Sequence, residues 1–254
     1  MTGTLRIVGL GPGGPEHRTP AAARAVAGAE LVVGYGPYVD QCADLLRDDQ
    51  AVERGRMGEE ERRADEALER AAAGARVALV SSGDAGVYGM AARTLARAAA
   101  LPEHRRPDVA VVPGMTAALA AAALLGAPLA DDWATLSLSD LRTPWEVVER
   151  RLSAVAASGL ALALYNPRSP TRTRQLDRVV EVLGEHRDGA TAAAVVTDAA
   201  RPGEDVLRTT LADLDAGTVT MRSLLLVAGE SARQAGPWLV AERVPRPAAT
   251  EAAR

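Results

Sequence analysis

A short apolar run, Val77 to Val80, leads directly into a loop of small residues, Ser81-Ser-Gly-Asp-Ala-Gly86. An unbroken apolar run of this kind is typical of a strand that is buried on both faces of a sheet. A helical pattern follows from 87 to about 100, so the chain forms a strand, a tight loop and a helix. Ligands bind at such carboxyl ends of strands in open α/β sheets. The residues leave two readings of Asp84 open: a site carboxylate or the N-cap of the helix.

Strands and helices continue to alternate through the first half of the chain, which predicts a parallel sheet with covering helices. Expected strands there are 4–10, 31–34, 77–80 and 108–112, and expected helices are 20 onward, 37–46, 58–74, 87–100 and 117–125. The second half predicts strands at 135–139, 160–165, 192–197, 206–210 and 223–228, with helices at 144–156 and 171–186. Its last strands lack intervening helices, which indicates a mixed sheet.

We therefore predict an α/β protein of two α/β domains, a parallel-sheet N-terminal domain and a mixed-sheet C-terminal domain, with a cleft between them. The expected boundaries are an N-terminal domain at 1–128, a C-terminal domain at 129–241 and a flexible tail at 242–254. The chain has 254 residues, of which 48% are hydrophobic, so it can form a real core. Its net charge of -4 argues against a nucleic-acid partner.

The sequence also predicts where the protein works. It has no apolar run long enough to cross a membrane and no basic-then-apolar signal pattern, so we expect a cytoplasmic protein with no membrane partner. Its single cysteine, Cys42, has no His or Cys neighbour at metal-ligand spacing, and no metal site is expected. All 29 basic residues are Arg, a bias that genomic base composition explains best, although it also suits recognition of a polycarboxylate.

A second loop, Gly9-Leu-Gly-Pro-Gly-Gly14, formally contains the G-x-G-x-x-G pattern of dinucleotide-binding proteins. Prolines hold the chain in a loop here, and the helix begins only near Pro20, with Thr19 as its cap. The next strand ends in Tyr35 rather than in the acidic residue that a ribose hydroxyl needs. The context therefore favours a loop that admits a large flat ligand over a dinucleotide site.

Several phrases together resemble one family, the tetrapyrrole methyltransferases of cobalamin and siroheme synthesis. Residues 4 to about 241 share the resemblance, and the family-level phrases are Val8-Gly-Leu-Gly-Pro-Gly13, Ser82-Gly-Asp-Ala-Gly86 and Pro113-Gly-Met-Thr-Ala117. Narrower phrases resemble the branch that methylates C17 of precorrin-3B: Met57-Gly-Glu-Glu60 with Arg63, Ser137-Leu-Ser-Asp-Leu141 with Thr143-Pro-Trp145, and Tyr165-Asn-Pro-Arg-Ser169. The chain departs from the family at Ala85, where proline is usual, at Gly14, and at Val227-Ala-Gly-Glu-Ser231.

The resemblance implies two α/β domains in a homodimer, with S-adenosyl-L-methionine as cofactor and a tetrapyrrole polycarboxylate as substrate. It implies methylation at C17 coupled to contraction of the ring, and the cobalt-containing substrate of the anaerobic route is the alternative. Methyl transfer from a sulfonium is an in-line displacement in which alignment supplies much of the acceleration, so no catalytic triad is expected.

The resemblance also implies site residues. Those expected along the cofactor are Gly83, Asp84, Val87, Thr116, Ala117, Tyr165, Asn166, Ala199 and Ser223. Those expected on the substrate are Gly9, Gly11, Pro12, Gly13, Ser139, Asp140 and Arg168. Candidates for the proton transfers of ring contraction are Asp84, Asp140 and Tyr165.

Simpler readings remain beside these. Asn166 could belong to a turn that caps the next helix, Ser139-Asp140 could form an Asx turn, and Trp145 is expected to pack rather than to stack on a ligand. The rival functions are another corrin or siroheme methyltransferase, a binding protein that keeps the fold without activity, and a dinucleotide oxidoreductase.

Overall fold

A computed structural model describes residues 2–169 and 172–243. The chain divides into two compact units, Met1–Ala120 with Asp198–Glu204, and Ala121–Thr197 with Asp205–Arg254. The change of unit near Ala120 precedes the boundary expected at 128. The structure also assigns to the first unit a short segment from far along the chain, which the sequence did not predict.

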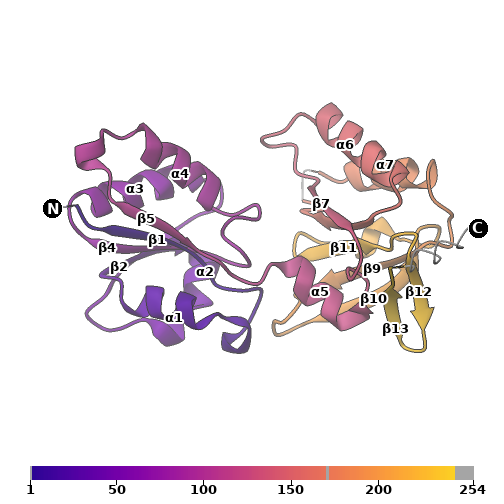
Figure 1. The fold of residues 1–254 in the computed structure, drawn as a ribbon, viewed down its shortest axis with the longest axis horizontal. Coiled ribbons are helices and arrows are strands. Elements are labelled where there is room, and N and C mark those ends of the chain that lie inside the picture. Colours follow the sequence, from indigo (N-terminus) through magenta and orange to yellow (C-terminus); the bar gives the residue numbers. More distant parts are fainter. Residues whose placement is uncertain (1, 170–171, 244–254) are drawn as a thin grey trace, which may run out of the picture. The chain divides into compact units, whose positions relative to one another are not determined.

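Unit 1 is a parallel five-stranded sheet in the order β3-β2-β4-β1-β5 (Figure 1). Its strands are β1 (Thr4–Gly9), β2 (Leu31–Tyr35), β3 (Ala51–Gly55), β4 (Arg76–Ser81) and β5 (Asp108–Val112). Its helices are α1 (Pro20–Ala27), α2 (Gly36–Asp40), α3 (Glu60–Ala72) and α4 (Ala91–Ala100), and α5 (Ala117–Leu125) begins in this unit. Short 3-10 turns lie at Pro15–His17, Ala43–Leu45 and Glu103–Arg105. The predicted parallel sheet is confirmed.

Side chains of alternate residues divide the core of unit 1 into two layers. Leu5 and Ile7 of β1 pack with alanines of α3 and α4, whereas Val8 packs with Val26 of α1 and Val39 of α2. Such alternation follows from the period of two in a strand. Helices therefore cover both faces of the sheet, and the ends of its strands are left to carry loops (Figure 1).

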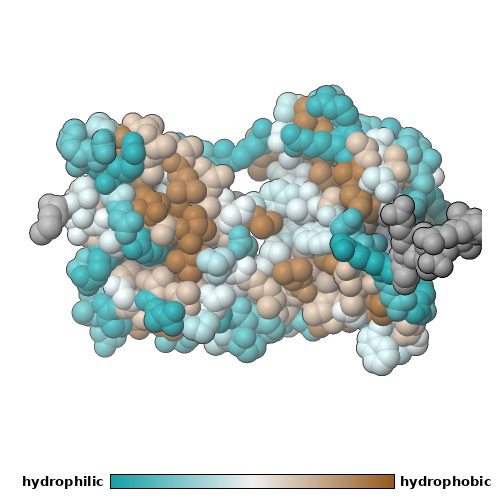
Figure 2. Space-filling model, in the orientation of Figure 1, coloured by the Kyte–Doolittle hydropathy of each residue, from teal (hydrophilic) through white to brown (hydrophobic). Residues whose placement is uncertain are grey.

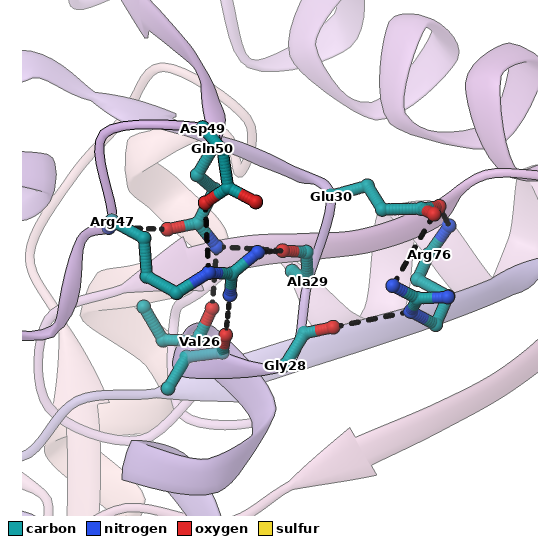
Figure 3. A network of polar contacts seen from close by, with 9 residues as sticks. Val26, Gly28, Ala29, Glu30, Arg47, Asp49, Gln50 and Arg76 are labelled. Carbon is teal, nitrogen blue, oxygen red and sulfur yellow. Dashed lines mark hydrogen bonds and ion pairs between the residues drawn. The ribbon is translucent and has the colours of Figure 1, made fainter.

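A polar network closes the carboxyl end of α1, as Figure 3 shows. Gln50 Nε2 donates to the carbonyl oxygens of Val26, at 2.7 Å, and Ala29, at 2.8 Å. Arg47 donates to Ala29 O at 3.4 Å, and Arg76 Nε donates to Gly28 O at 3.2 Å. The last carbonyls of a helix have no partner within the helix, so these side chains satisfy groups that burial would otherwise penalise.

Unit 2 contains a mixed five-stranded sheet in the order β10-β9-β11-β8-β7, as predicted for the second half. Only β7 and β8 pair in parallel, and the other neighbours are antiparallel. Its strands are β7 (Trp133–Ser137), β8 (Ala161–Tyr165), β9 (Ala192–Thr197), β10 (Asp205–Thr210) and β11 (Ser223–Val227). Helices α6 (Trp145–Ala157) and α7 (Gln175–Gly184) contribute to its core, and a 3-10 turn lies at Ala216–Thr218.

A second, small sheet in unit 2 was not predicted. It pairs β12 (Ala232–Ala235) with β13 (Trp238–Ala241), and β13 with the two-residue β6 (Gly126–Ala127). The expected tail at 242–254 falls almost entirely outside the described residues. Among the described residues, no helix is long and apolar enough to cross a membrane.

Several predicted helices are shorter than expected, among them the helix expected at 171–186, which is α7 (Gln175–Gly184). The helix expected at 37–46 consists of α2 and a separate 3-10 turn. The helix expected at 87–100 begins at Ala91, because the preceding residues form an extended loop in which Tyr88 has a positive φ of 54°. Backbone of that kind cannot continue a right-handed helix.

Candidate functional site

The carboxyl edge of the sheet in unit 1 carries the first group of candidate residues. The chain leaves β1 for α1 on one face, and it leaves the neighbouring β4 for α4 on the other face. Adjacent strands whose connections depart to opposite faces form a switch point, where open α/β sheets bind ligands in a crevice. The loops after β1, β4 and β5 all begin at this edge, because the three strands are parallel.

Asp84 joins two of these loops. Its Oδ2 accepts the backbone N–H of Gly114 at 2.9 Å, and its Oδ1 accepts that of Gly86 at 2.7 Å. The helix that follows begins at Ala91 with Met90 as its N-cap, so the reading of Asp84 as a helix cap is wrong. Asp84 instead fixes the loop after β4 to the loop after β5 through charge-assisted hydrogen bonds.

Gly83 lies in the middle of this arrangement, is half-buried and has room for a Cβ. It has a φ of 65°, and an added Cβ would come no closer than 3.9 Å to Met115 O, Thr116 Cα and Ala117 N. Thr116 and Ala117, which begin α5, are both half-buried, as are Val87 and Asp84. The structure therefore places the cofactor residues that were predicted in the N-terminal half on two neighbouring loops, which the hydrogen bonds of Asp84 join.

The positions of the Pro/Gly loop require glycine because neighbouring backbone lies close to them. A Cβ on Gly9 would lie 2.7 Å from Gly114 N, and one on Gly13 would lie 1.5 Å from Ala200 O. Gly11 has a φ of 82°, and its Cβ would meet His17 O at 2.4 Å. These glycines and Pro12 are buried. Glycine is required at these positions because backbone packs against backbone, while the expected contact of this loop with a substrate stays a prediction.

The segment Asp198–Glu204 packs on this loop, and sequence reasoning named only Ala199 from it. Ala200 O accepts the backbone N–H of Gly14 at 3.2 Å. Asp198 and Ala200 have positive φ values of 50° and 61°. Non-glycine residues adopt this conformation rarely, and such positions gather at functional sites. Ala199 itself is half-buried between them.

Burial changes the titration of two groups close to this edge. It raises the pKa of the Tyr38 phenol above its usual value, an effect that the charge of Arg201 partly offsets. Burial also raises the pKa of the Cys42 thiol to about 11, with the nearby Arg18 opposing it. Neither group can serve as an ionised nucleophile near neutral pH, in agreement with the structural role expected for Cys42.

In unit 2, the ends of β7 and β8 carry the second group of candidates. Asn166 follows β8 with a positive φ of 51°, and its Nδ2 donates to Ser137 Oγ at 2.9 Å. Leu138 N donates to Tyr165 O at 2.9 Å, so the two strand ends are joined by backbone as well. The structure thus places Tyr165 and Asn166, expected on the cofactor, beside the segment that carries Ser139 and Asp140, expected on the substrate.

Arg172, which was not predicted, organises this second group. Its side chain is 8% exposed, and its Nη2 donates to Asn166 O at 2.6 Å. Its Nη1 lies 3.7 Å from Asp140 Oδ1, and Gln175 Nε2 donates to Asp140 Oδ2 at 3.1 Å. These contacts fix Asp140 at the strand ends. The neighbouring Ser139 donates its backbone N–H to Ser137 Oγ at 3.4 Å. No local sequence pattern marks Arg172, because its partner Asp140 comes from a different part of the chain.

Three other predicted residues have protein partners of their own. Arg168 Nη1 donates to Ala216 O, which commits part of that guanidinium to holding a loop. Ser223 Oγ lies 2.8 Å from Thr197 Oγ1 and accepts Thr220 N at 2.9 Å, so this hydroxyl joins β11 to its surroundings. Trp145 packs against the core of unit 2, as its packing reading expected.

Comparison with known proteins decides the family. The model of the tetrapyrrole (corrin/porphyrin) methylases matches residues 4–215, which is most of the chain. The chain belongs to this family. The resemblance drawn from the loop phrases is therefore confirmed, and so is the fold class.

Two curated relatives match over nearly their whole length. The probable cobalt-factor III C(17)-methyltransferase of Salmonella typhimurium is 42% identical over 229 residues, which are 89% of this chain and 93% of the relative. The precorrin-3B C(17)-methyltransferase of a Sinorhizobium species is 41% identical over 234 residues, 92% of this chain and 91% of the relative. The crystal structure of the methyltransferase CobJ has a TM-score of 0.90 and 38% identity, and the match covers 95% of this chain and all of that one.

Proposed function

We propose that this protein transfers a methyl group from S-adenosyl-L-methionine to C17 of a corrin precursor, either precorrin-3B or its cobalt-containing counterpart. The observation that supports it most is identity above 40% to two C17-methyltransferases across nine-tenths of their length. A dinucleotide oxidoreductase is no longer a rival, because the chain belongs to the tetrapyrrole methylases.

The loops of unit 1 fit the proposed cofactor. Gly83 lies beside Thr116 and Ala117, and an added Cβ there would come no closer than 3.9 Å to them, so the loop leaves room for a ligand to approach its backbone. When bound, S-adenosyl-L-methionine would supply an electrophilic methyl group with a neutral thioether as leaving group. Residues around Gly83 and Val87 would bind and orient it, with backbone amides and carbonyls as the polar partners.

Asp84 acts in this proposal as an orienting residue. Both of its oxygens already accept backbone N–H groups, so its task is to fix the spacing of the loops on either side of β1. Alignment of donor and acceptor atoms is worth about 7–11 kcal/mol in well-oriented reactions, and such fixed loops are how a protein secures it. Tyr165 and Asp140 remain the candidates for the proton transfers of ring contraction.

The substrate residues proposed in unit 2 are Ser139, Asp140 and Arg168. Asp140 is held by Gln175 and Arg172, and its side chain is 35% exposed, so it keeps an accessible surface. A polycarboxylate substrate would find guanidinium partners in a chain whose cationic side chains, His aside, are all Arg. The cytoplasmic location is part of the same proposal.

A homodimer completes the proposal. Figure 2 shows hydrophobic residues gathered on the face of unit 1 in the region of α4 and β5. Leu95 of α4 is 40% exposed, Val111 of the edge strand β5 is 37% exposed, and Met115 after it is 36% exposed. An apolar edge of a sheet favours association with another chain. Light scattering should give twice the chain mass of 26.4 kDa, and a monomer would contradict this part.

The decisive experiment is an anaerobic incubation with methyl-labelled S-adenosyl-L-methionine and, in parallel, precorrin-3B and cobalt-factor III. Mass spectrometry and carbon NMR would locate the added methyl group. A methyl at C17 in either arm supports the proposal and identifies the natural form of the substrate. A methyl at another carbon would agree with the family but contradict the proposed position of methylation. Binding of S-adenosylhomocysteine without turnover on either substrate would favour a binding protein.

A further inference from the structure

Every carbonyl of the Gly11–Gly13 loop is bound by one of two side chains from distant parts of the sequence. Gln41 Nε2 donates to Gly11 O at 2.8 Å and to Gly13 O at 2.9 Å. Arg201 Nε donates to Pro12 O, between them. Arg201 Nη2 also donates to Gln41 Oε1 at 3.3 Å, so the two side chains hold each other. We call Gln41 and Arg201 the loop clamp.

The loop clamp reaches the neighbouring Gly-Asp loop as well. Arg201 Nη2 donates to Ser82 Oγ, and Ser82 Oγ donates to Gly11 O at 3.4 Å. Gly11 and Gly83 exchange two backbone hydrogen bonds, of 3.0 Å and 2.7 Å. These contacts join the loop clamp to Ser82 and Gly83 at the start of the Gly-Asp loop, whereas Asp84 holds the rest of that loop through Gly86 and Gly114.

Both members of the loop clamp are themselves held in place. Arg201 N donates to Asp198 O at 2.9 Å, and Ala200 N donates to Glu204 Oε2 at 2.7 Å, which closes the segment on itself. Gln41 O accepts Arg18 Nη2 at 2.7 Å, and Arg18 pairs with Asp44 at 2.8 Å. Fixed donors lose little entropy when they bind, so such contacts position a loop more strongly than mobile side chains would.

The partners of Arg201 are unusual for a half-buried guanidinium. They are a carbonyl, an amide oxygen and a hydroxyl, and no carboxylate among the described residues pairs with it. An Arg that only stabilised the fold would gain more from a carboxylate, because charge-assisted pairs are the stronger ones. Its guanidinium instead joins three neutral acceptors at once, the carbonyl of Pro12, the side-chain amide of Gln41 and the hydroxyl of Ser82.

We propose that Arg201 and Gln41 are positioning residues, which set the conformation of the Gly11–Gly13 loop for the tetrapyrrole. The role toward the tetrapyrrole rests on the proposed function, because the loop faces that substrate only if the protein is the proposed methyltransferase. The hold of Arg201 and Gln41 on the loop does not depend on it. The loop clamp selects one conformation of the loop before any ligand arrives, so its loss should weaken substrate binding more than it weakens cofactor binding.

The first test follows the ligand-free protein by hydrogen exchange. Arg201→Gln keeps a hydrogen-bonding group but loses the fork, and amides of Gly11 and Gly14 should then exchange about tenfold faster. Gln41→Glu keeps acceptors for Arg201 but loses both donors to the loop, and it should have the same effect. Arg208→Gln is the matched control, because Arg208 also donates to a backbone carbonyl, that of Leu124, and should leave these amides unchanged.

Unchanged exchange in both Arg201→Gln and Gln41→Glu would overturn the loop clamp. A uniform increase over the whole chain would show that these residues only stabilise the fold, which also overturns the proposal. Arg201→Lys serves as a milder variant if Arg201→Gln fails to fold, since it keeps the charge but has a single donor nitrogen in place of the fork.

The second test measures two affinities on the same variants by titration. The dissociation constant for the tetrapyrrole should rise about tenfold in Arg201→Gln, while that for S-adenosylhomocysteine should rise at most about threefold. An equal loss for both ligands contradicts the positioning role. A different result would be that the variants show faster exchange at the loop while neither they nor the wild type bind a tetrapyrrole. That result would support the loop clamp and contradict the proposed function.

Discussion

At the scale of residues, the candidate site depends on side chains that bind backbone rather than on side chains that present reactive groups. Asp84, Gln41 and Arg201 together hold the loops that follow β1, β4 and β5. A methyl transfer that needs alignment more than acid-base chemistry is well served by such an arrangement.

Asp84→Ala tests this role directly. The change removes two charge-assisted hydrogen bonds, and the loops on either side of β1 should then move independently. We expect the dissociation constant for S-adenosylhomocysteine to rise at least about tenfold, with a loss of stability of about 1.5–3 kcal/mol. Titration calorimetry and thermal melting measure the two. Asp108→Ala, which breaks an exposed pair with Arg6, is the control and should change neither by much. Lower stability with unaltered affinity would contradict the role given to Asp84.

The raised pKa of Cys42 predicts a loss of stability in alkali. The thiol ionises near pH 8.5 in the unfolded chain and at about pH 11 in the folded protein. The folded pKa is the higher one, so the free energy of unfolding is unaffected below pH 8.5 and falls between there and pH 11, by about 3 kcal/mol at most.

Urea unfolding at a series of pH values measures this loss. Cys42→Ala should flatten the curve between pH 8.5 and 10, whereas the ionisation of Tyr38, whose pKa burial also raises, acts only above about pH 10. An identical pH dependence in Cys42→Ala and wild type would show that another group is responsible.

At the scale of elements, the sequence predicted what is local and missed what is paired at a distance. The apolar runs gave β1, β2, β4 and β8 nearly to the residue, because buried strands carry their own signal. Pro20 and Thr19 gave the start of α1, where Thr19 Oγ1 accepts Ala22 N at 3.1 Å.

The missed elements have physical reasons. β3 lies at an edge of the sheet and is half polar, so its strand character comes from pairing with β2. β12 and β13 are each four residues long, too short for a pattern to emerge. Arg201 and Pro12 are 189 positions apart, and no local pattern can report such a contact. The loop phrases located Gly83, Asp84 and Thr116, because that part of the site is built from neighbours in sequence.

Gly114→Ala and Gly184→Ala should differ clearly in their effect on stability. A Cβ there would lie 2.2 Å from Gly83 O, so Gly114→Ala must push the loops after β4 and β5 apart. We expect a loss of stability of about 1–3 kcal/mol, or several degrees in melting temperature. Gly184→Ala, at the end of α7, has open space around it and should be neutral or slightly stabilising. Similar melting temperatures for the two variants would contradict the packing of these loops.

At the scale of the whole molecule, each unit has its own hydrophobic core. Leucines and valines of β8, α6 and α7 form the core of unit 2, while β1, β2 and β4 lie between the two core layers of unit 1. Proteins with separate cores depart from two-state unfolding.

We therefore expect the calorimetric enthalpy of unfolding to exceed the van't Hoff enthalpy. Scanning calorimetry at several protein concentrations makes the measurement and separates domain unfolding from dissociation of a dimer, since only the latter depends on concentration. A ratio of one at all concentrations would mean that the two cores unfold as one.

The segment Asp198–Glu204 also has a consequence for how such chains can be recombined. It belongs to unit 1, although the strands on either side of it belong to unit 2. A chimera of two family members joined by a single crossover near position 120 would inherit Gln41 from one parent and Arg201 from the other. Protein engineers who exchange halves between these enzymes would therefore need two further junctions, so that this segment travels with the N-terminal half that it completes.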